Sequence, residues 1–167
     1  IIIKNVKITG KAGIVVDLNT GKILFEKSKK LPLPLASITK IMSILVASEH
    51  LQPNDIIAWN GEEWRFSDLL DIALVTSSNE ATEAISLTTA RNLPNNDFVE
   101  AMNKKAETIG LKQTKFINET GLDLNLSYAG SYGTAEDVAK LFAYTVKNHS
   151  WILSATNDDH IRRTALS

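Results

Sequence analysis

An apolar segment directly after a short polar motif constrains the fold of this chain more than any other feature. Ser37-Ile38-Thr39-Lys40 is followed by residues that are apolar on nearly every side of a helix, namely Ile41, Met42, Ile44, Leu45, Val46 and Ala47. A helix that is apolar all round is normally buried inside a domain rather than laid on its surface. The sequence therefore predicts a central buried helix over about residues 37–50, which ends near Gln52-Pro53.

The start of this helix brings a hydroxyl and an amine together. Ser37 and Lys40 are three residues apart, so they share one face of a helix. Burial and the positive end of the helix dipole both favour the neutral form of a lysine in the first turn. A neutral amine is a base that can activate the serine as a nucleophile. The alternative is that Ser37 caps the helix and Lys40 extends to water, since such short motifs often arise without function.

A second polar motif, Ser77-Ser78-Asn79, lies in a break between two expected helices. A hydroxyl and an amide on such a break can reach into a cleft, where the hydroxyl relays a proton and the amide binds a substrate backbone. The alternative is that Ser78 or Asn79 only caps the following helix.

Periodicity and turn signals predict a mixed α/β domain. Strands are expected at 13–17 and 22–26, joined by the turn at 18–21, and shorter extended segments at 55–59 and 63–66. Further helices are expected from an N-cap at Ser67 to about 75, over 80–90, from Asn95 or Asn96 to Gly110, and over 134–147. We therefore expect residues 1–167 to form one domain, with a sheet hairpin at 12–27 and a mainly helical body at 37–150.

Composition excludes several classes of function. The chain has no cysteine, which rules out disulfides, thiolate catalysis and cysteine-based zinc sites. The net charge of −1 includes no basic block, so nucleic acid is not an expected partner. Asp158-Asp159-His160 is interpreted as a polar turn rather than a metal site, and neither a metal nor a cofactor is expected. The first residues lack the features of a signal peptide, so any export signal is expected outside this chain.

The order S-x-x-K and then S-x-N resembles penicillin-binding proteins and serine β-lactamases. The match extends further and is similar to the D-alanyl-D-alanine carboxypeptidases of peptidase family S11, the low-molecular-mass penicillin-binding proteins. The similar segments are Gly13 to Lys30, Pro34 to Met42, Ser67 to Leu70, Ser77 to Ala81, Asn118 to Asp123 and Thr134 to Ala139. The resemblance spans roughly residues 12–147 in order, and it implies the penicillin-binding transpeptidase-like α/β fold.

This resemblance also implies a role for each motif residue. Ser37 would be the acylated nucleophile and Lys40 its base, Ser77 would relay a proton to the leaving amine, and Asn79 would bind the substrate backbone. The Ser37 N–H would supply half of an oxyanion hole. The implied reaction is hydrolysis of the terminal D-Ala-D-Ala bond of peptidoglycan stem peptides, outside the cytoplasmic membrane, and β-lactams would acylate the same serine.

Two departures from the family pattern matter. Glu119 stands where the pattern has proline, and no K-T-G follows Ser77; Thr9-Gly10-Lys11 and Thr20-Gly21-Lys22 have the wrong order and precede Ser37. We therefore expect this chain to lack the C-terminal sheet strands and to be inactive alone. A separate C-terminal fragment or a neighbouring copy is then expected to complete the sheet edge.

Two other interpretations remain open. A class A β-lactamase needs a glutamate within E-x-x-L-N, and the segment from Glu119 to Asp123 comes close but ends in aspartate. A non-catalytic, peptidoglycan-binding relative would be consistent with the missing K-T-G.

Overall fold

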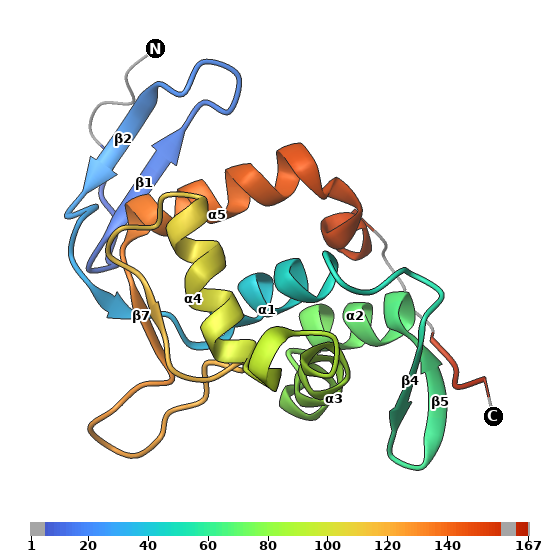
Figure 1. Cartoon of the computed structure of the whole chain (residues 1–167). Coiled ribbons are helices and arrows are strands. Elements are labelled where there is room, and N and C mark those ends of the chain that lie inside the picture. Colours follow the sequence, from blue (N-terminus) through green and yellow to red (C-terminus); the bar gives the residue numbers. More distant parts are fainter. Residues whose placement is uncertain (1–5, 158–162, 167) are drawn as a thin grey trace.

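Helix α1 (Thr39–Ala47) lies at the centre of the structure, a computed structural model that describes residues 6–157 and 163–166. All nine of its residues are buried. It contacts the four other α-helices of the described residues (Figure 1), which are α2 (Phe66–Val75), α3 (Asn79–Ala90), α4 (Phe98–Thr108) and α5 (Ala135–Asn148). The apolar run after Lys40 thus forms the predicted buried helix, because it packs against all four of these helices.

The core forms where apolar faces of these helices meet α1. Met42, Ile44 and Leu45 are fully buried, together with residues from each surrounding helix, namely Phe66, Leu69, Leu70, Ile85, Met102 and Leu141. Burying a side chain of this size contributes roughly 1.5–3 kcal/mol relative to leaving it exposed. The packing of this core fixes the position of the N-terminal end of α1.

Two antiparallel hairpins flank the helical body. Strand β1 (Gly13–Val16) pairs with β2 (Ile23–Lys27), and α5 packs against β1. Strand β4 (Ile56–Trp59) pairs with β5 (Glu62–Arg65). The turn of this second hairpin is Asn60-Gly61, where both residues have positive φ, as such two-residue turns require.

A third sheet, made of three very short strands, was not predicted from the sequence. Strand β7 (Ser131–Gly133) lies between β3 (Leu33–Pro34) and β6 (Lys115–Phe116), and both pairings are antiparallel. Within the segment between β6 and β7, the exposed residues 122–128 project from the body (Figure 1). This sheet ties the chain just before Ser37 to the chain on either side of residues 117–130.

Several helix boundaries differ from the sequence predictions. The chain before α1 forms a 3₁₀ turn, η1 (Ala36–Ile38), so α1 begins two residues later than expected and ends at Ala47 rather than near 50. Ser67 lies inside α2, whose N-cap is Arg65. Residues 95 and 96 belong to a separate 3₁₀ turn, η2 (Pro94–Asn96).

Helix α4 begins later than expected because a different residue caps it. Asp97 is its N-cap, and its carboxylate accepts a hydrogen bond from the Glu100 N–H at 2.8 Å. Aspartate caps helices about as well as asparagine, so preference alone did not separate Asp97 from the two residues before it. A last 3₁₀ segment, η3 (Ser150–Asn157), follows α5. The Asp158-Asp159-His160 cluster lies outside the described residues.

Candidate active site

The structure brings Ser37 and Lys40 together at the start of α1. Ser37 lies in η1 and is exposed, whereas Lys40 lies in the first turn of α1 and is only 2% exposed. The Lys40 Nζ lies 3.2 Å from the Ser37 Oγ. The alternative in which Lys40 extends to water is therefore wrong, because the core surrounds its side chain.

Burial sets the electrostatics of Lys40. Desolvation lowers the pKa of its amine below 10.5, and the negative charge of Glu80 acts in the opposite direction and is the smaller effect. The Nζ also donates a hydrogen bond to the Thr120 carbonyl at 3.1 Å. A lysine with a lowered pKa is neutral in a larger fraction of molecules, which is the state that can accept a proton from Ser37.

Ser77 completes a cluster of three side chains. It lies between α2 and α3, and its Oγ donates a hydrogen bond to the Ser37 Oγ at 2.8 Å, across 40 positions of sequence. Its backbone has a φ of 58°, a conformation that is uncommon for a residue other than glycine and that clusters at functional sites. Tertiary packing therefore holds this hydroxyl at Ser37.

The other two residues of the Ser77 motif have different positions. The Ser78 Oγ accepts a hydrogen bond from the Ala81 N–H at 3.1 Å and donates one to Glu80 at 3.0 Å, so Ser78 is the N-cap of α3. Asn79 is the first residue of α3 and is partly exposed. It lies two residues after Ser77 in the sequence, and its predicted role with substrate stays a prediction.

A loop that sequence reasoning did not place at the site supports it from the other side. Two carbonyls of residues 118–122 face α1: Thr120 accepts from Lys40, and Glu119 accepts from the Ser43 hydroxyl at 2.5 Å. The Asn118 side chain closes the loop by accepting from the Gly121 N–H and donating to the Leu122 carbonyl, both at 2.7 Å. Two sequence features could have indicated these contacts. One is the family resemblance of the segment from Asn118 to Asp123, and the other is Ser43, a single serine within an otherwise apolar helical segment.

The loop at 118–122 also packs against the chain just before Ser37, where Gly121 approaches the backbone of Ala36. A hydrogen bond between the Thr39 and Ser131 hydroxyls adds a further link from α1 to β7. The start of α1 is thus fixed from two directions, by the core beneath it and by the loop and β7 beside it. Such fixed placement is what a nucleophile and its base need.

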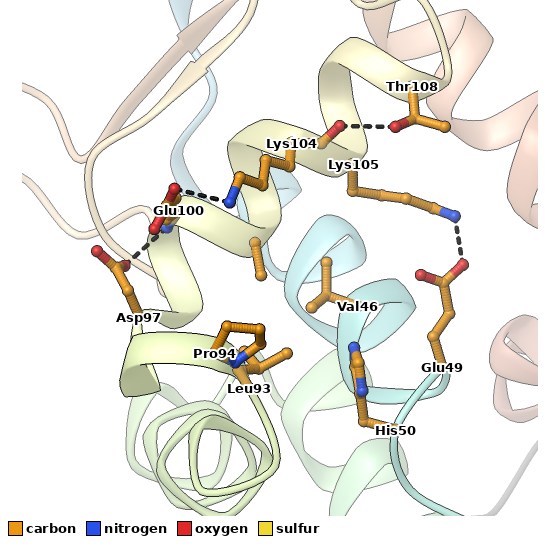
Figure 2. A pocket seen from close by; sticks show the side chains of 11 residues that line it. Val46, Glu49, His50, Leu93, Pro94, Asp97, Glu100, Lys104, Lys105 and Thr108 are labelled. Carbon is orange, nitrogen blue, oxygen red and sulfur yellow. Dashed lines mark hydrogen bonds and ion pairs between the residues drawn. The ribbon is translucent and has the colours of Figure 1, made fainter.

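A separate hollow of ≈ 360 Å³ lies at the opposite end of α1, beside α4 (Figure 2). Its lining includes Glu49 and Glu100 and two lysines, but Lys104 pairs with Glu100 at 2.7 Å and Lys105 pairs with Glu49. Both lysines of the lining are thus paired with a glutamate, and Asp97, which also lines the hollow, caps α4. The candidate nucleophile and base lie at the other end of α1, where Ser37 and Lys40 meet.

Comparison with known proteins agrees with this geometry. The family model described as D-alanyl-D-alanine carboxypeptidase (Peptidase S11) matches residues 2–59 and 54–166. A D-alanyl-D-alanine endopeptidase of Pseudomonas aeruginosa is 35% identical over 78% of this chain and 45% of its own length. The D-alanyl-D-alanine carboxypeptidase DacF of Bacillus subtilis is 30% identical over 91% of this chain and 43% of its own length. The chain thus spans less than half the length of these two relatives.

The fold is also that of a solved penicillin-binding protein. Penicillin-binding protein D2 of Listeria monocytogenes, in its ampicillin-bound form, superposes with a TM-score of 0.80 at 22% identity and covers 96% of this chain and 71% of its own. This likeness confirms the predicted mixed α/β, transpeptidase-like fold. Because the family model spans nearly the whole sequence, the chain belongs to the Peptidase S11 family of D-alanyl-D-alanine carboxypeptidases.

Proposed function

We propose that the protein is a serine-type hydrolase that removes the terminal D-alanine from peptidoglycan stem peptides through an acyl-Ser37 intermediate. The observation that carries this proposal is the meeting of Ser37, Lys40 and Ser77, with the Lys40 amine buried and within 3.2 Å of the Ser37 hydroxyl. Membership of the family and its relatives' names supply the substrate class.

In the proposed acylation, the neutral Lys40 amine takes the proton of Ser37 as the Ser37 Oγ bonds to the carbonyl carbon of the penultimate D-alanine. The Ser37 N–H, at a helix start, stabilises the negative charge that develops on the carbonyl oxygen. As the C–N bond breaks, the proton passes from Lys40 through the Ser77 hydroxyl to the leaving nitrogen. Free D-alanine departs and an ester to Ser37 remains.

In the proposed deacylation, water is the nucleophile and the Ser37 oxygen is the leaving group. A water molecule attacks the ester carbon while Lys40 takes its proton, and that proton returns to the Ser37 oxygen as the ester bond breaks. Asn79, at the start of α3, would hold the substrate backbone through its amide during both steps. β-Lactams would acylate Ser37 by opening of the lactam C–N bond, a proposal that the ampicillin-bound relative supports.

Two features of the proposal concern the whole protein. Its substrate lies outside the cytoplasmic membrane, so we propose an extracytoplasmic location. Within the described residues, no helix has the length and apolar character needed to cross a bilayer.

The K-T-G sequence is absent after Ser77 in residues 1–167. If K-T-G supplies the second oxyanion donor, these residues alone should turn over about 100- to 1,000-fold more slowly than with that segment present.

A second activity is favoured by one relative. The Pseudomonas protein is named an endopeptidase, so cleavage of a cross-linked stem peptide is a candidate beside removal of a terminal D-alanine. The experiment is to incubate the full-length protein with a pentapeptide ending in D-Ala-D-Ala and, separately, with a cross-linked peptide dimer. Released D-alanine supports the carboxypeptidase, cleaved dimer supports the endopeptidase, and rapid turnover of penicillin alone would support a β-lactamase instead.

A further inference from the structure

The Ser43 hydroxyl is bonded differently from three threonine hydroxyls in or at the end of other helices. Thr76, Thr89 and Thr145 each return their hydroxyl to the carbonyl four residues earlier, at 2.8 Å, 2.8 Å and 3.0 Å. The Ser43 Oγ lies 3.5 Å from the corresponding carbonyl of Thr39 and 2.5 Å from the Glu119 carbonyl. Its hydroxyl therefore serves the loop at 118–122 rather than its own helix.

Ser43 and Lys40 act on the same loop from one face of α1. They are three residues apart, so both side chains point the same way. Ser43 donates to the Glu119 carbonyl and Lys40 donates to the carbonyl of the next residue, Thr120. The two carbonyls belong to consecutive planar peptide units that meet at the Thr120 Cα, so once the first is fixed only the φ and ψ of Thr120 decide where the second lies.

The Thr120 carbonyl decides how the Lys40 amine is oriented. A neutral amine has two N–H donors and one lone pair. With one N–H held by Thr120 at 3.1 Å, rotation about the Cε–Nζ bond is restricted, and the lone pair can face the Ser37 Oγ at 3.2 Å. Without that acceptor the amine would sample other rotations, and fewer of them would accept the Ser37 proton.

We propose that Ser43 is a positioning residue, which holds the Glu119–Thr120 peptide so that the Thr120 carbonyl orients the Lys40 amine toward Ser37. This inference rests on the proposed function of Lys40 as the base. Ser43 itself is fully buried and touches neither Ser37 nor substrate. Loss of its hydroxyl should therefore slow the chemical step and leave binding of the ligand unchanged.

The test uses the full-length protein and a fluorescent penicillin. Stopped-flow labelling over a range of concentrations separates the acylation rate constant from the dissociation constant of the encounter complex. Ser43→Ala should lower the acylation rate constant roughly 10- to 100-fold, the scale of a modest misplacement of reacting groups, with the dissociation constant unchanged. The matched control is Ser86→Ala, since Ser86 is another buried helical serine and bonds only to the Glu83 carbonyl of its own helix; its rates should match wild type.

The pH dependence separates positioning from a general loss of structure. An acceptor for the Lys40 N–H favours the charged amine, so displacement of the Thr120 carbonyl should lower the pKa of Lys40 further. The midpoint of the pH-dependent rise in acylation should then move to lower pH in Ser43→Ala and stay in place in Ser86→Ala.

Two results would overturn the inference. One is an acylation rate constant in Ser43→Ala equal to that of wild type, and the other is a lower rate constant whose pH profile has the same midpoint as wild type. A failure of the proposed function itself is distinguishable, because wild-type protein would then show no labelling at Ser37 or Lys40→Ala would label as fast as wild type.

Discussion

Gly121 packs directly against the backbone of Ala36, the residue before the proposed nucleophile. A Cβ atom at position 121 would lie 1.9 Å from the Ala36 carbonyl oxygen and 2.5 Å from the Thr39 Oγ1. Gly121 has a φ of 78°, and Ala36 has a φ of 47° although it is not glycine. The loop at 118–122 can approach η1 this closely only because position 121 has no side chain.

Gly121→Ala should therefore damage both stability and acylation. The methyl group would push the loop away from α1, and overpacking of this kind typically costs about 1–3 kcal/mol. Gly110→Ala is the matched control, since Gly110 also has positive φ, 75°, but nothing within 4 Å of a Cβ. Thermal unfolding and penicillin labelling should show both effects for Gly121→Ala and only a stability loss for Gly110→Ala. Equal labelling rates in the two variants would contradict this role of the loop.

Alanine substitutions at the two neighbouring serines Ser77 and Ser78 should have different effects, one on acylation and the other on stability. Ser77→Ala removes the hydroxyl that contacts Ser37, so acylation and D-alanine release should fall about 100-fold or more. Ser78→Ala removes the N-cap of α3 and should cost about 1 kcal/mol of stability with labelling largely kept. Measuring unfolding and labelling for both variants checks the assignment, which fails if Ser78→Ala is the slower of the two.

Lys40 should give the acylation rate its dependence on pH. Since burial lowers its pKa below 10.5, the rate should rise with pH through that lowered pKa as the amine becomes neutral. Lys40→Ala should slow acylation about 100- to 10,000-fold and remove this rise. The pH profile of labelling, measured for both proteins, is the check; a wild-type rate that is flat with pH would count against Lys40 as the base.

The same shift predicts how stability depends on pH. Between the folded pKa of Lys40 and its unfolded value near 10.5, the unfolded chain binds more protons, so stability rises with pH in that window. Below the folded pKa the amine is charged in both states, and the full cost of burying that charge is present. Urea unfolding of Lys40→Met should lack this rise.

Asp137 should prove structural rather than catalytic. It is 1% exposed, and one carboxylate oxygen accepts from the Gln113 N–H at 2.7 Å and the Thr114 hydroxyl at 3.1 Å. Asp137→Ala would leave these donors unpaired in the interior, at a cost of about 2–4 kcal/mol. Lys104→Ala, which breaks only the exposed pair with Glu100, should cost less than about 1 kcal/mol. Similar unfolding free energies for the two variants would contradict the prediction.

Local signals predicted the parts of the site that lie close together in sequence. The apolar run gave the buried helix, and spacing of three residues gave the Ser37–Lys40 contact. The contact of Ser77 with Ser37 was implied by family resemblance, because no local pattern relates residues 40 positions apart. The Ser43–Glu119 contact joins residues 76 positions apart and depends on where the core places the loop.

The small sheet shows a second limit of local patterns. Strands β3 and β6 have two residues each, too few for the alternation that marks a strand. Their pairing with β7 depends on the packing of distant segments. The start of α4 was misplaced for a different reason, since Asn95, Asn96 and Asp97 all have the chemistry of a cap and geometry chose among them. Helices α1 and α2 begin after Ile38 and Arg65, whose side chains make no capping hydrogen bond.

Covalent labelling of Ser37 tests the central claim most directly. The full-length protein is incubated with a fluorescent penicillin, digested and analysed by mass spectrometry, with Ser37→Ala treated in parallel. The proposed mechanism predicts that one penicilloyl group is attached to the peptide that contains Ser37. It also predicts that the Ser37→Ala variant is not labelled, although this exposed substitution should leave the core intact. Labelling that persists in Ser37→Ala, or that maps to Ser77, would contradict it.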